Sequence, residues 1–442
     1  MVTNRVGRMR IDPVGPLKGE LTVPGDKSIT HRAIILGSLA DGTSEITGAL
    51  RSHDCRDTAK AFGTMGVTIQ EPDNGRLQIR GGGLYGLKEP QKVLDVGNSG
   101  TTMRLLAGVL AAQPFFSVLT GDRYLCARPM ARVTVPLRSM GATILGREGG
   151  NLPPLAIKGT HLRAIDYASP IASAQVKSAI LFAGLFADGR TTVTEPSLSR
   201  DHTERMFEAV GIPIHRNGLR LQVDSIKGIS PFQMAIPGDF SAAAFFLVAA
   251  LVIPGSELTL RQVGVNPTRT GLLDALQSMG AAIEVSRRRI VSGEPVADLH
   301  VRSQALHGTE VTGELIPRML DEIPIFAVAA ALAAGPTTIR NAAELRVKEV
   351  DRLAALVQEL RRFGVKIEQH PDGLTIQGNS SLLGCDCDSW GDHRMAMALA
   401  VTGLAAEGST TISDPSSVSS SFPDFWERLN AILPGAAVAI EQ

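Results

Sequence analysis

Four short segments of this 442-residue chain combine cations with hydroxyl groups or acids, and each stands where an apolar helix should begin. They are residues 27–32 (KSITHR), 98–104 (NSGTTMR), 346–352 (RVKEVDR) and 392–394 (DHR). A helix N-terminus exposes unpaired N–H groups and carries partial positive charge, so cations there are unfavourable unless an anion joins them. The four segments therefore predict a pocket for an anionic ligand.

Ordinary structural explanations exist for the same residues. Lys348, Glu349 and Arg352 have the spacing of an ion-pair set on a helix surface, which contributes about 0.2–0.5 kcal/mol per pair. Lys27 and Arg32 taken alone fit a solvated helix face. On these residues alone the explanations stay open.

A nucleotide-binding loop is excluded at Lys27-Ser28. The motif requires glycine directly before the lysine and another five positions earlier. This chain has Asp26 and Leu21 at those positions.

The cysteines give weak signals for metal binding or nucleophilic catalysis. Cys385 and Cys387, followed by Asp392 and His393, superficially resemble a metal site, but a second cysteine pair is missing. Cys126 precedes an Ala-Arg-Pro sequence and could be a nucleophile, although most single cysteines serve packing.

The elements that must position these residues form an internal repeat. Six times, a helix-like apolar segment ends at a glycine that a short apolar strand follows, about every 70 residues. These glycines are Gly66, Gly141, Gly211, Gly280, Gly364 and Gly435. A second series of glycines lies between small-residue helices and the strands that follow them. It comprises Gly42, Gly189, Gly255, Gly335 and Gly408. Each copy is large enough for a compact αβ unit.

Two Pro-Gly-Asp tripeptides, at 24–26 and 237–239, divide the six copies into two sets of three and are predicted to be hinges. We therefore expect one three-copy domain over residues 25–237 and another over 1–24 plus 238–442. The strand material at residues 9–23 would then have to pair with the C-terminal half of the chain.

The clearest single element is a helix expected directly after Lys348. Its apolar face, at three-to-four spacing, consists of Leu353, Leu356, Val357, Leu360 and Phe363. Residues 416–421 are expected to be a polar loop.

The composition excludes several classes of protein. Hydrophobic residues make up 44%, charged residues 20% and aromatic residues 4%, and 44 basic residues balance 44 acidic ones. This argues against disorder, and against nucleic acid as a partner, because a basic footprint and stacking aromatics are missing. The longest apolar run, residues 242–253, is too short to span a bilayer, and the basic N-terminus lacks an apolar signal core. We expect a cytoplasmic α/β protein without a disulfide framework.

Eight ordered blocks over nearly the whole chain resemble the 5-enolpyruvylshikimate-3-phosphate (EPSP) synthase family. They are PGDKSITHR (24–32), GNSGTTMRL (97–105), LTGDRYLCARPM (119–130), ASAQVKSA (172–179), LDEIP (320–324), ELRVKEVDRL (344–353), GDHRMAM (391–397) and SFPDF (421–425). ASAQVKSA, SFPDF and the RDHT sequence at 200–203 are similar to the class II, bacterial branch.

The resemblance implies a fold of two domains, each with three βαβαββ copies, joined by two crossovers, with the site between them. It implies transfer of the enolpyruvyl group of phosphoenolpyruvate to the 5-hydroxyl of shikimate 3-phosphate through a tetrahedral ketal, with release of phosphate. Both substrates carry a carboxylate and a phosphate, which suits the many arginines. No metal or other cofactor is implied, because fixed cations neutralise the leaving phosphate.

The resemblance also implies roles for individual residues. Asp321 is the candidate base, Glu349 the candidate acid and base at the methylene carbon, and Lys27 an assistant. The implied contacts of shikimate 3-phosphate are Lys27, Ser28, Arg32, Ser173, Ala174, Gln175, Arg200, Asp321 and Lys348. Those of phosphoenolpyruvate are Lys27, Gly100, Arg128, Gln175, Arg352 and Arg394. The domain over 25–237 would be the shikimate 3-phosphate side.

The chain departs from many relatives at two anion contacts: Ser420-Ser421 stands where a lysine is frequent, and Ala174 replaces a serine. Gly100 keeps the space that alanine fills in some glyphosate-tolerant relatives, so we expect glyphosate to inhibit. We also expect a monomer.

Two alternatives remain. A UDP-N-acetylglucosamine enolpyruvyl transferase usually has a reactive cysteine five residues before the arginine of its Ala-Arg-Pro motif, where this chain has Arg123. It also has Lys-Asn in place of Lys27-Ser28. A non-catalytic anion-binding scaffold would be expected to lack Asp321 or Glu349, and both are present.

Overall fold

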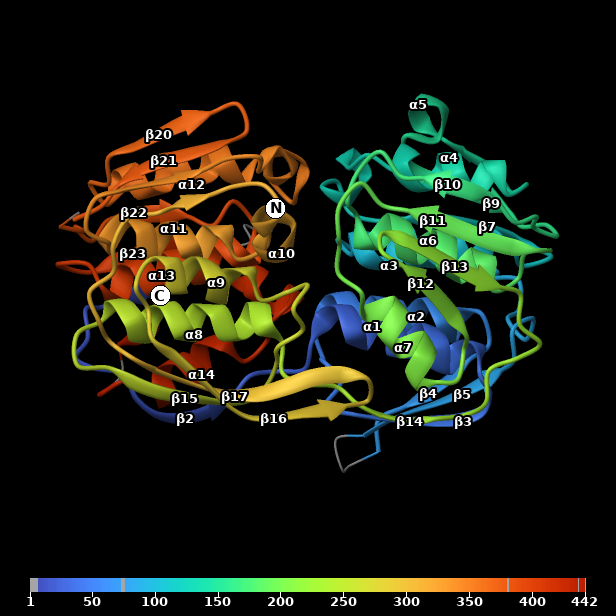
Figure 1. The fold of residues 1–442 in the computed structure, drawn as a ribbon, viewed down its shortest axis with the longest axis horizontal. Helices are drawn as coiled ribbons and strands as arrows, with labels where there is room; N and C mark the ends of the chain where they lie inside the picture. Colours follow the sequence, from blue (N-terminus) through green and yellow to red (C-terminus); the bar gives the residue numbers. More distant parts are fainter. Residues whose placement is uncertain (1–6, 73–75, 380, 436, 442) are drawn as a thin grey trace, which may run out of the picture. The chain divides into compact units, whose positions relative to one another are not determined.

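The computed structural model describes residues 7–72, 76–379, 381–435 and 437–441, so the first six residues of the basic N-terminus lie outside it. The chain forms two compact units (Figure 1). Unit 1 comprises Met1–Pro24, Gly238–Arg289 and Pro295–Gln442, and unit 2 comprises Gly25–Pro237 and Ile290–Glu294. The chain thus passes between the units after Pro24 and after Pro237.

Unit 2 contains three four-stranded sheets of one topology, in the orders β14-β3-β5-β4, β6-β7-β9-β8 and β10-β11-β13-β12. In each sheet the first pair of strands is parallel and the other two pairs are antiparallel. The strands are β3 (Asp41–Thr47), β4 (Thr68–Gln70), β5 (Arg76–Gly82), β6 (Leu94–Asp95), β7 (Phe116–Thr120), β8 (Thr143–Gly146), β9 (Leu152–Lys158), β10 (Asp166–Ala168), β11 (Arg190–Thr194), β12 (Ile214–Asn217), β13 (Arg220–Asp224) and β14 (Gln233–Ala235).

Unit 1 repeats this plan with the sheets β2-β15-β17-β16, β18-β19-β21-β20 and β22-β23-β1-β24. The N-terminal strands complete two of them: β1 pairs with β23 and β24, and β2 pairs with β15, as predicted for the strand material near the N-terminus. The strands are β1 (Arg8–Ile11), β2 (Lys18–Thr22), β15 (Glu257–Gly264), β16 (Ile283–Val291), β17 (Glu294–Arg302), β18 (Glu310–Val311), β19 (Pro336–Ile339), β20 (Ile367–His370), β21 (Gly373–Gln377), β22 (Asp386–Asp388), β23 (Thr410–Ser413) and β24 (Val438–Glu441). The predicted fold of six βαβαββ copies, three in each domain, is confirmed.

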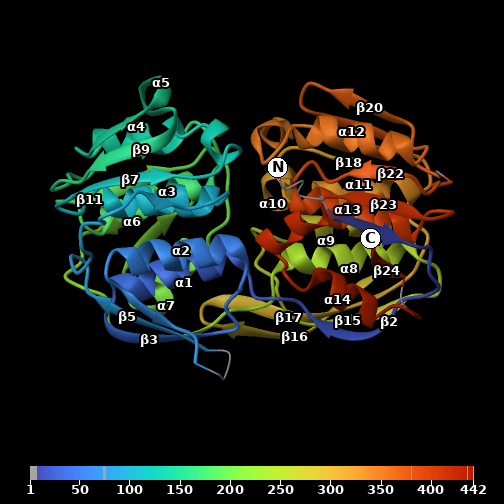
Figure 2. The same ribbon diagram turned by 180° about the vertical axis from the view of Figure 1, so that it is seen from behind.

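Each unit encloses three helices that are buried on nearly every side, as expected of helices that are apolar all round. Those of unit 2 are α1 (Lys27–Leu39), α3 (Gly100–Leu110) and α6 (Ala174–Gly184), and those of unit 1 are α8 (Phe240–Val252), α11 (Ile323–Leu332) and α13 (His393–Leu404). The apolar run at residues 242–253 is therefore a core helix. Figure 2 shows both units from behind.

The remaining helices are less deeply buried. They are α2 (His53–Thr64), α4 (Ala131–Ser139), α5 (Arg147–Gly150), α7 (His202–Ala209), α9 (Gly271–Ser278), α10 (Leu315–Met319), α12 (Arg352–Arg362), α14 (Phe425–Ala431) and the 3₁₀ segments η1 (Leu125–Ala127), η2 (Ala343–Val347) and η3 (Pro415–Ser420).

The repeat glycines occupy left-handed backbone positions. All six of the first series have φ between 81° and 116°, and all five of the second have φ between 76° and 128°. A side chain is disfavoured there, which explains why glycine recurs at the end of each helix.

Two local predictions were wrong. The helix expected directly after Lys348 begins only at Arg352, because the Asp351 side chain accepts a hydrogen bond from the Ala354 N–H and caps it there. Residues 416–421 are largely not a loop but belong to η3, in which Ser417 and Ser420 donate hydrogen bonds to nearby carbonyls.

The turn of the β16–β17 hairpin was not anticipated either. Residues Ile290–Glu294 pack with unit 2, although the flanking strands belong to unit 1. Within unit 2, Glu294 Oε1 lies 2.7 Å from His202 Nδ1, within hydrogen-bond distance, and both side chains are buried. The Ser292 hydroxyl accepts a hydrogen bond from the Ala235 N–H.

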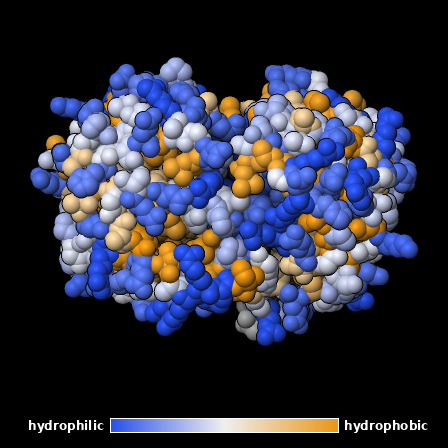
Figure 3. Space-filling view, viewed as in Figure 1, coloured by the Kyte–Doolittle hydropathy of each residue, from blue (hydrophilic) through white to orange (hydrophobic). Residues whose placement is uncertain are grey.

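Polar side chains are spread over the surface of each unit, and apolar ones form small groups on the face seen in Figure 3. Among the described residues, no helix combines the length and apolarity needed to cross a lipid bilayer.

Candidate active site

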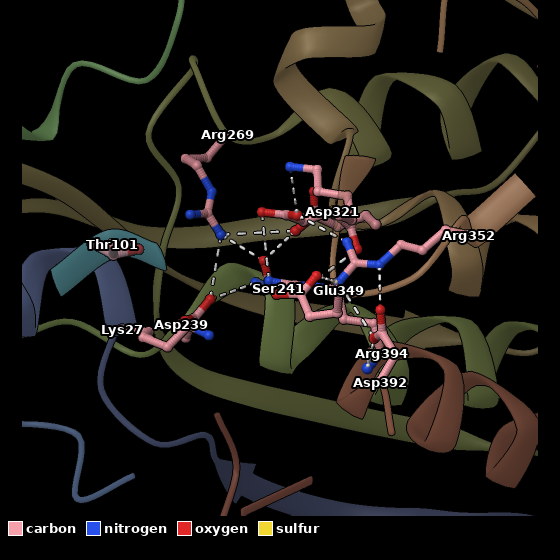
Figure 4. A network of polar contacts seen from close by, with 12 residues as sticks. Lys27, Thr101, Asp239, Ser241, Arg269, Asp321, Glu349, Arg352, Asp392 and Arg394 are labelled. Carbon is pink, nitrogen blue, oxygen red and sulfur yellow. Dashed lines mark hydrogen bonds and ion pairs between the residues drawn. The ribbon is translucent and has the colours of Figure 1, made fainter. Parts of the chain in front are cut away.

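In unit 1, two carboxylates lie among three cations (Figure 4). The Asp321 carboxylate is 3.3 Å from Arg352 Nη1, 3.6 Å from Lys348 Nζ and 3.5 Å from Arg394 Nη2. The Asp321 backbone carbonyl accepts a 3.3 Å hydrogen bond from Arg394. Glu349 accepts a 2.8 Å hydrogen bond from Arg352. The sequence predicted all five residues, and the structure brings them together.

Arg352 is the centre of this group. Its side chain is 1% exposed, and it donates to Asp392 through Nε at 2.7 Å and through Nη2 at 3.3 Å. Burial alone would lower the pKa of Arg352, but the carboxylates of Asp392, Glu349 and Asp321 raise it above its usual value. The guanidinium is therefore a permanent cation, and the surface ion-pair explanation of Glu349 and Arg352 is wrong.

Helix N-termini position these side chains. Asp321 stands two residues before α11, Arg352 is the first residue of α12, and Arg394 is the second residue of α13. Asp392 caps α13 by accepting hydrogen bonds from the N–H groups of Arg394 and Met395. One acid thus fixes both the start of α13 and the guanidinium of Arg352.

Lys348 extends from the segment between η2 and α12 and is partly buried. Burial lowers the pKa of Lys348 below its usual value, and the nearby Asp321 carboxylate partly opposes this effect. Burial makes the charged form of Lys348 less favourable, so an anion that compensates this charge would be bound well beside Asp321.

In unit 2, the enclosed helices expose only their first turns. Every residue of α1, α3 and α6 is buried except Lys27, Ser28, Thr101, Ala174 and Gln175. Four of these five are predicted site residues. Polar groups left accessible at three otherwise buried helix N-termini are suited to bind anions.

At the start of α1, Asp26 caps the helix through the Ile29 N–H at 2.9 Å. Lys27 Nζ lies 3.2 Å from the Asp54 carboxylate, which comes from α2. Arg32 is 3% exposed and donates hydrogen bonds to Thr203, Ser178 and the Ser28 carbonyl, so a solvated helix face is also the wrong explanation here.

Arg200 lies just before α7, close enough to Arg32 to act on its charge. Burial lowers the pKa of Arg32 to about 10, the acids Glu204 and Asp26 oppose this shift, and Arg200 adds to it. Two neighbouring guanidinium groups favour the approach of an anion.

The first turns of α3 and α6 contact each other through Gln175. Its amide oxygen accepts a 2.5 Å hydrogen bond from Arg104, and its amide nitrogen donates to Thr101 at 2.9 Å. Ser173 caps α6 by accepting from the Val176 N–H, which places Ala174 as the first helical residue.

Arg128 reaches the same region from the segment after η1. Its Nη2 donates to the Asn98 side chain at 2.5 Å, and the residue is 8% exposed. A Cβ atom added at Gly100 would lie 3.1 Å from both Arg104 Nη1 and Arg128 Nη1. Glycine at position 100 therefore leaves room for two guanidinium groups beside the start of α3.

Several supporting residues were missed by sequence reasoning. Asp54, Asn98 and Asp392 hold Lys27, Arg128 and Arg352 respectively. Asp392 and Asn98 stood inside the motifs and could have been found there as caps or neighbours. Asp54 gave no signal, because its role follows only from the packing of α2 against α1.

The weak cysteine signals gain no support. Among the described residues, His, Cys, Asp and Glu side chains do not gather in a group of three or more that could hold a metal ion. Burial raises the pKa of Cys385 to about 11 and also raises the pKa of Cys387, which disfavours the thiolate that a metal requires. Cys126 donates to the Gly121 carbonyl at 3.3 Å.

Six βαβαββ copies in two units, with cations at the helix N-termini and two carboxylates among them, define an enolpyruvyl transferase. A family model described as EPSP synthase (3-phosphoshikimate 1-carboxyvinyltransferase) matches residues 11–429. The chain belongs to this family.

Relatives named 3-phosphoshikimate 1-carboxyvinyltransferase are 56% identical over 424 residues in Desulforudis audaxviator and 52% identical over 423 residues in Desulforamulus reducens. Both alignments cover 96% of this chain and 99% of the relative. The structure of an EPSP synthase from Acinetobacter baumannii matches with a TM-score of 0.88 at 43% identity, covering 99% of this chain and 100% of that one.

Proposed function

We propose that this protein transfers the enolpyruvyl group of phosphoenolpyruvate to the 5-hydroxyl of shikimate 3-phosphate and releases phosphate. The observation that carries the proposal is the placement of Asp321 and Glu349 among Lys348, Arg352 and Arg394 in unit 1. Family membership over residues 11–429 supports it. A UDP-N-acetylglucosamine substrate is not favoured.

The cations are assigned to the anionic groups of the two substrates. Ser28 and Arg32 bind the carboxylate of shikimate 3-phosphate. Its phosphate is bound by Ser173, Gln175, Arg200 and Lys348, beside the first turn of α6 at Ala174. Phosphoenolpyruvate is surrounded by Lys27, Gly100, Arg128, Gln175, Arg352 and Arg394. The accessible first turns of α1 and α6 support these assignments.

The first step is an addition. Asp321 accepts the proton of the 5-hydroxyl while that oxygen bonds to C2 of phosphoenolpyruvate. The C2–C3 double bond breaks, and C3 takes a proton from Glu349 to become a methyl group. Lys27 assists at the oxygen that bridges C2 and the phosphate.

The second step is an elimination. Glu349 takes a proton back from the methyl group, the double bond forms again, and the C2–O bond to phosphate breaks. The proton that Asp321 accepted in the first step passes to the phosphate, which leaves as hydrogen phosphate. The leaving phosphate carries negative charge that the arginine and lysine side chains stabilise. Each carboxylate must alternate between its protonated and ionised forms, and Arg352 is fixed beside both of them.

Three finer statements complete the proposal. Glyphosate inhibits by occupying the phosphoenolpyruvate subsite, and the space beside Gly100 supports this. The protein acts as a monomer. Its sequence belongs to the class II branch, which the RDHT sequence at 200–203 supports.

The test is release of phosphate from phosphoenolpyruvate, measured separately with shikimate 3-phosphate and with UDP-N-acetylglucosamine. We expect release only with shikimate 3-phosphate. Release only with the nucleotide sugar would refute the proposal, and the absence of release with either would favour the non-catalytic scaffold.

A further inference from the structure

Unit 1 contains a buried arginine to which the mechanism above gives no role. Arg269 is 2% exposed and lies between β15 and α9. Its Nη2 donates to the Ser241 hydroxyl at 2.6 Å and to the Asp239 carboxylate at 3.3 Å, and lies 3.7 Å from Glu322 Oε1 (Figure 4).

The partners of Arg269 stand at the starts of two enclosed helices. Asp239 caps α8 by accepting from the Ser241 N–H at 2.7 Å. Glu322, 1% exposed, directly precedes α11, and its carboxylate accepts a hydrogen bond from the Ser241 hydroxyl. One guanidinium thus compensates two carboxylates and joins α8 to α11.

The loop that carries Arg269 is itself held in place. Asn266 accepts hydrogen bonds from the N–H and the hydroxyl of Thr268 at 3.0 and 2.8 Å. The backbone N–H of Arg269 donates to the Asn266 carbonyl at 2.8 Å. The guanidinium is therefore preorganised and can serve as a fixed reference point for its partners.

Glu322 is the neighbour in sequence of Asp321, the proposed base. Arg269 and Ser241 hold the Glu322 side chain, and Arg394 holds the Asp321 carbonyl at 3.3 Å. The peptide between the two acids is therefore held from both sides, directly beside the Asp321 side chain.

We propose that Arg269 is a positioning residue, which acts through Glu322 to orient the Asp321 carboxylate toward the hydroxyl that it deprotonates. This inference rests on the proposed function. It assigns Arg269 no contact with substrate.

The experiment combines Arg269→Met with Asp321→Ala, singly and together, in the full-length protein. We expect Arg269→Met to lower kcat by about 10²-fold in the wild-type background, because misplacement of a catalytic group by about 1 Å has that effect. In the Asp321→Ala background the residual rate should not fall further. The Kd of shikimate 3-phosphate, measured by calorimetry, should stay within about threefold, and Arg269→Lys should recover part of kcat.

Ser241→Ala tests the same connection without removing a charge and is expected to lower kcat less, in the same direction. If Arg269→Met does not fold, the kcat of Ser241→Ala decides whether this connection positions Asp321. The exposed Arg302→Met, which removes an ion pair with Glu257, is the matched control and should leave kcat unchanged.

An equal fall of kcat in both backgrounds would show a general structural role and overturn the proposal. So would an unchanged kcat, or a large loss of affinity for shikimate 3-phosphate. Wild-type turnover is measured first, so an inactive wild type would count against the proposed function and not against Arg269 in particular.

Discussion

At the scale of single residues, the chemistry depends on acids that are held by cations and cannot move freely. Arg352 contacts Asp321, Glu349 and Asp392 at once, and its own side chain is 1% exposed. Buried ion pairs can often be replaced by apolar residues without loss of stability, so stability alone does not explain a buried guanidinium with three acidic partners. In the proposed mechanism, Arg352 holds the two proton-transfer groups, Asp321 and Glu349, in place.

The first prediction concerns the two proposed proton-transfer groups. Glu349→Gln removes the acid and base at the methylene carbon but keeps the shape, so kcat should fall by about 10²–10⁴-fold while shikimate 3-phosphate still binds. Asp321→Ala should also lower kcat. Steady-state kinetics with calorimetric binding checks both, and a near-normal kcat would remove the residue concerned from the mechanism.

The second prediction concerns pH. Burial lowers the pKa of Lys348. As pH rises, the Lys348 ammonium group of the free protein therefore loses its proton before an ordinary lysine does, whose pKa is about 10.4. A neutral amine attracts a phosphate less, and therefore the affinity for shikimate 3-phosphate should fall as pH rises through this lowered pKa. Lys348→Arg stays protonated and should flatten the pH dependence of Kd. An identical pH profile for both proteins would contradict the assignment of Lys348.

The third prediction concerns Gly100. An alanine Cβ would lie 3.1 Å from Arg104 Nη1 and Arg128 Nη1, so one of these guanidinium groups must shift. Gly100→Ala should raise the KM for phosphoenolpyruvate by about tenfold and the inhibition constant of glyphosate by more. Inhibition is measured with phosphoenolpyruvate near its KM, and insensitivity of the wild type to millimolar glyphosate would refute the inhibitor assignment.

At the scale of elements, the two ends of the helices have different roles. The repeat glycines follow the helix ends in left-handed conformations, and the proposed site residues gather at the helix starts. In unit 2 the accessible residues of α1, α3 and α6 are confined to the first turn. The repeat therefore builds a core from the helix bodies and leaves the termini to vary.

The fourth prediction tests this division. Gly211 has a φ of 81°, and a Cβ added there would meet open space, so Gly211→Ala should cost about 1–2 kcal/mol of unfolding free energy through backbone strain alone. Gly63→Ala, in the helix α2 and also facing open space, is the matched control and should stabilise by about 0.5–1 kcal/mol. Denaturant unfolding measures both, and kcat should be unchanged. Equal effects at the two positions would contradict the backbone explanation.

The features that could be predicted from sequence are local ones. A left-handed glycine, a Pro-Gly-Asp turn and a cation at a helix start each depend on few neighbouring residues. The start of α12 was misplaced by three residues, because a cap at Asp351 outweighed the charge pattern. Such competition between caps is difficult to judge without coordinates.

The contacts between distant residues could not be predicted. Asp54 reaches Lys27 across 27 positions, and Ser241 reaches Glu322 across 81. Neither contact can be recognised from residue spacing or composition, since only the packing of helices brings the partners together. Sequence therefore pointed to the proposed substrate contacts, such as Lys27 and Arg352, but not to all of the residues that hold them in place, such as Asp54.

At the scale of the whole molecule, each unit has its own hydrophobic core and three sheets of one topology. Of the proposed site residues, Lys27, Arg128 and Arg200 belong to unit 2, and Glu349, Arg352 and Arg394 belong to unit 1. Neither unit carries a full set. Catalysis by this proposal therefore requires the intact chain.

In the proposed mechanism, the protonated carboxyl group of Glu349 gives its proton to C3 of phosphoenolpyruvate, and the resulting carboxylate later removes a proton from the methyl group. Turnover in D₂O with shikimate 3-phosphate tests it most directly, with deuterium at C3 of the enolpyruvyl product measured by NMR or mass spectrometry. Because the methyl group rotates before elimination, we expect deuterium in the vinyl position for the wild type and little turnover for Glu349→Gln. Product formed at the full rate without deuterium would contradict the account.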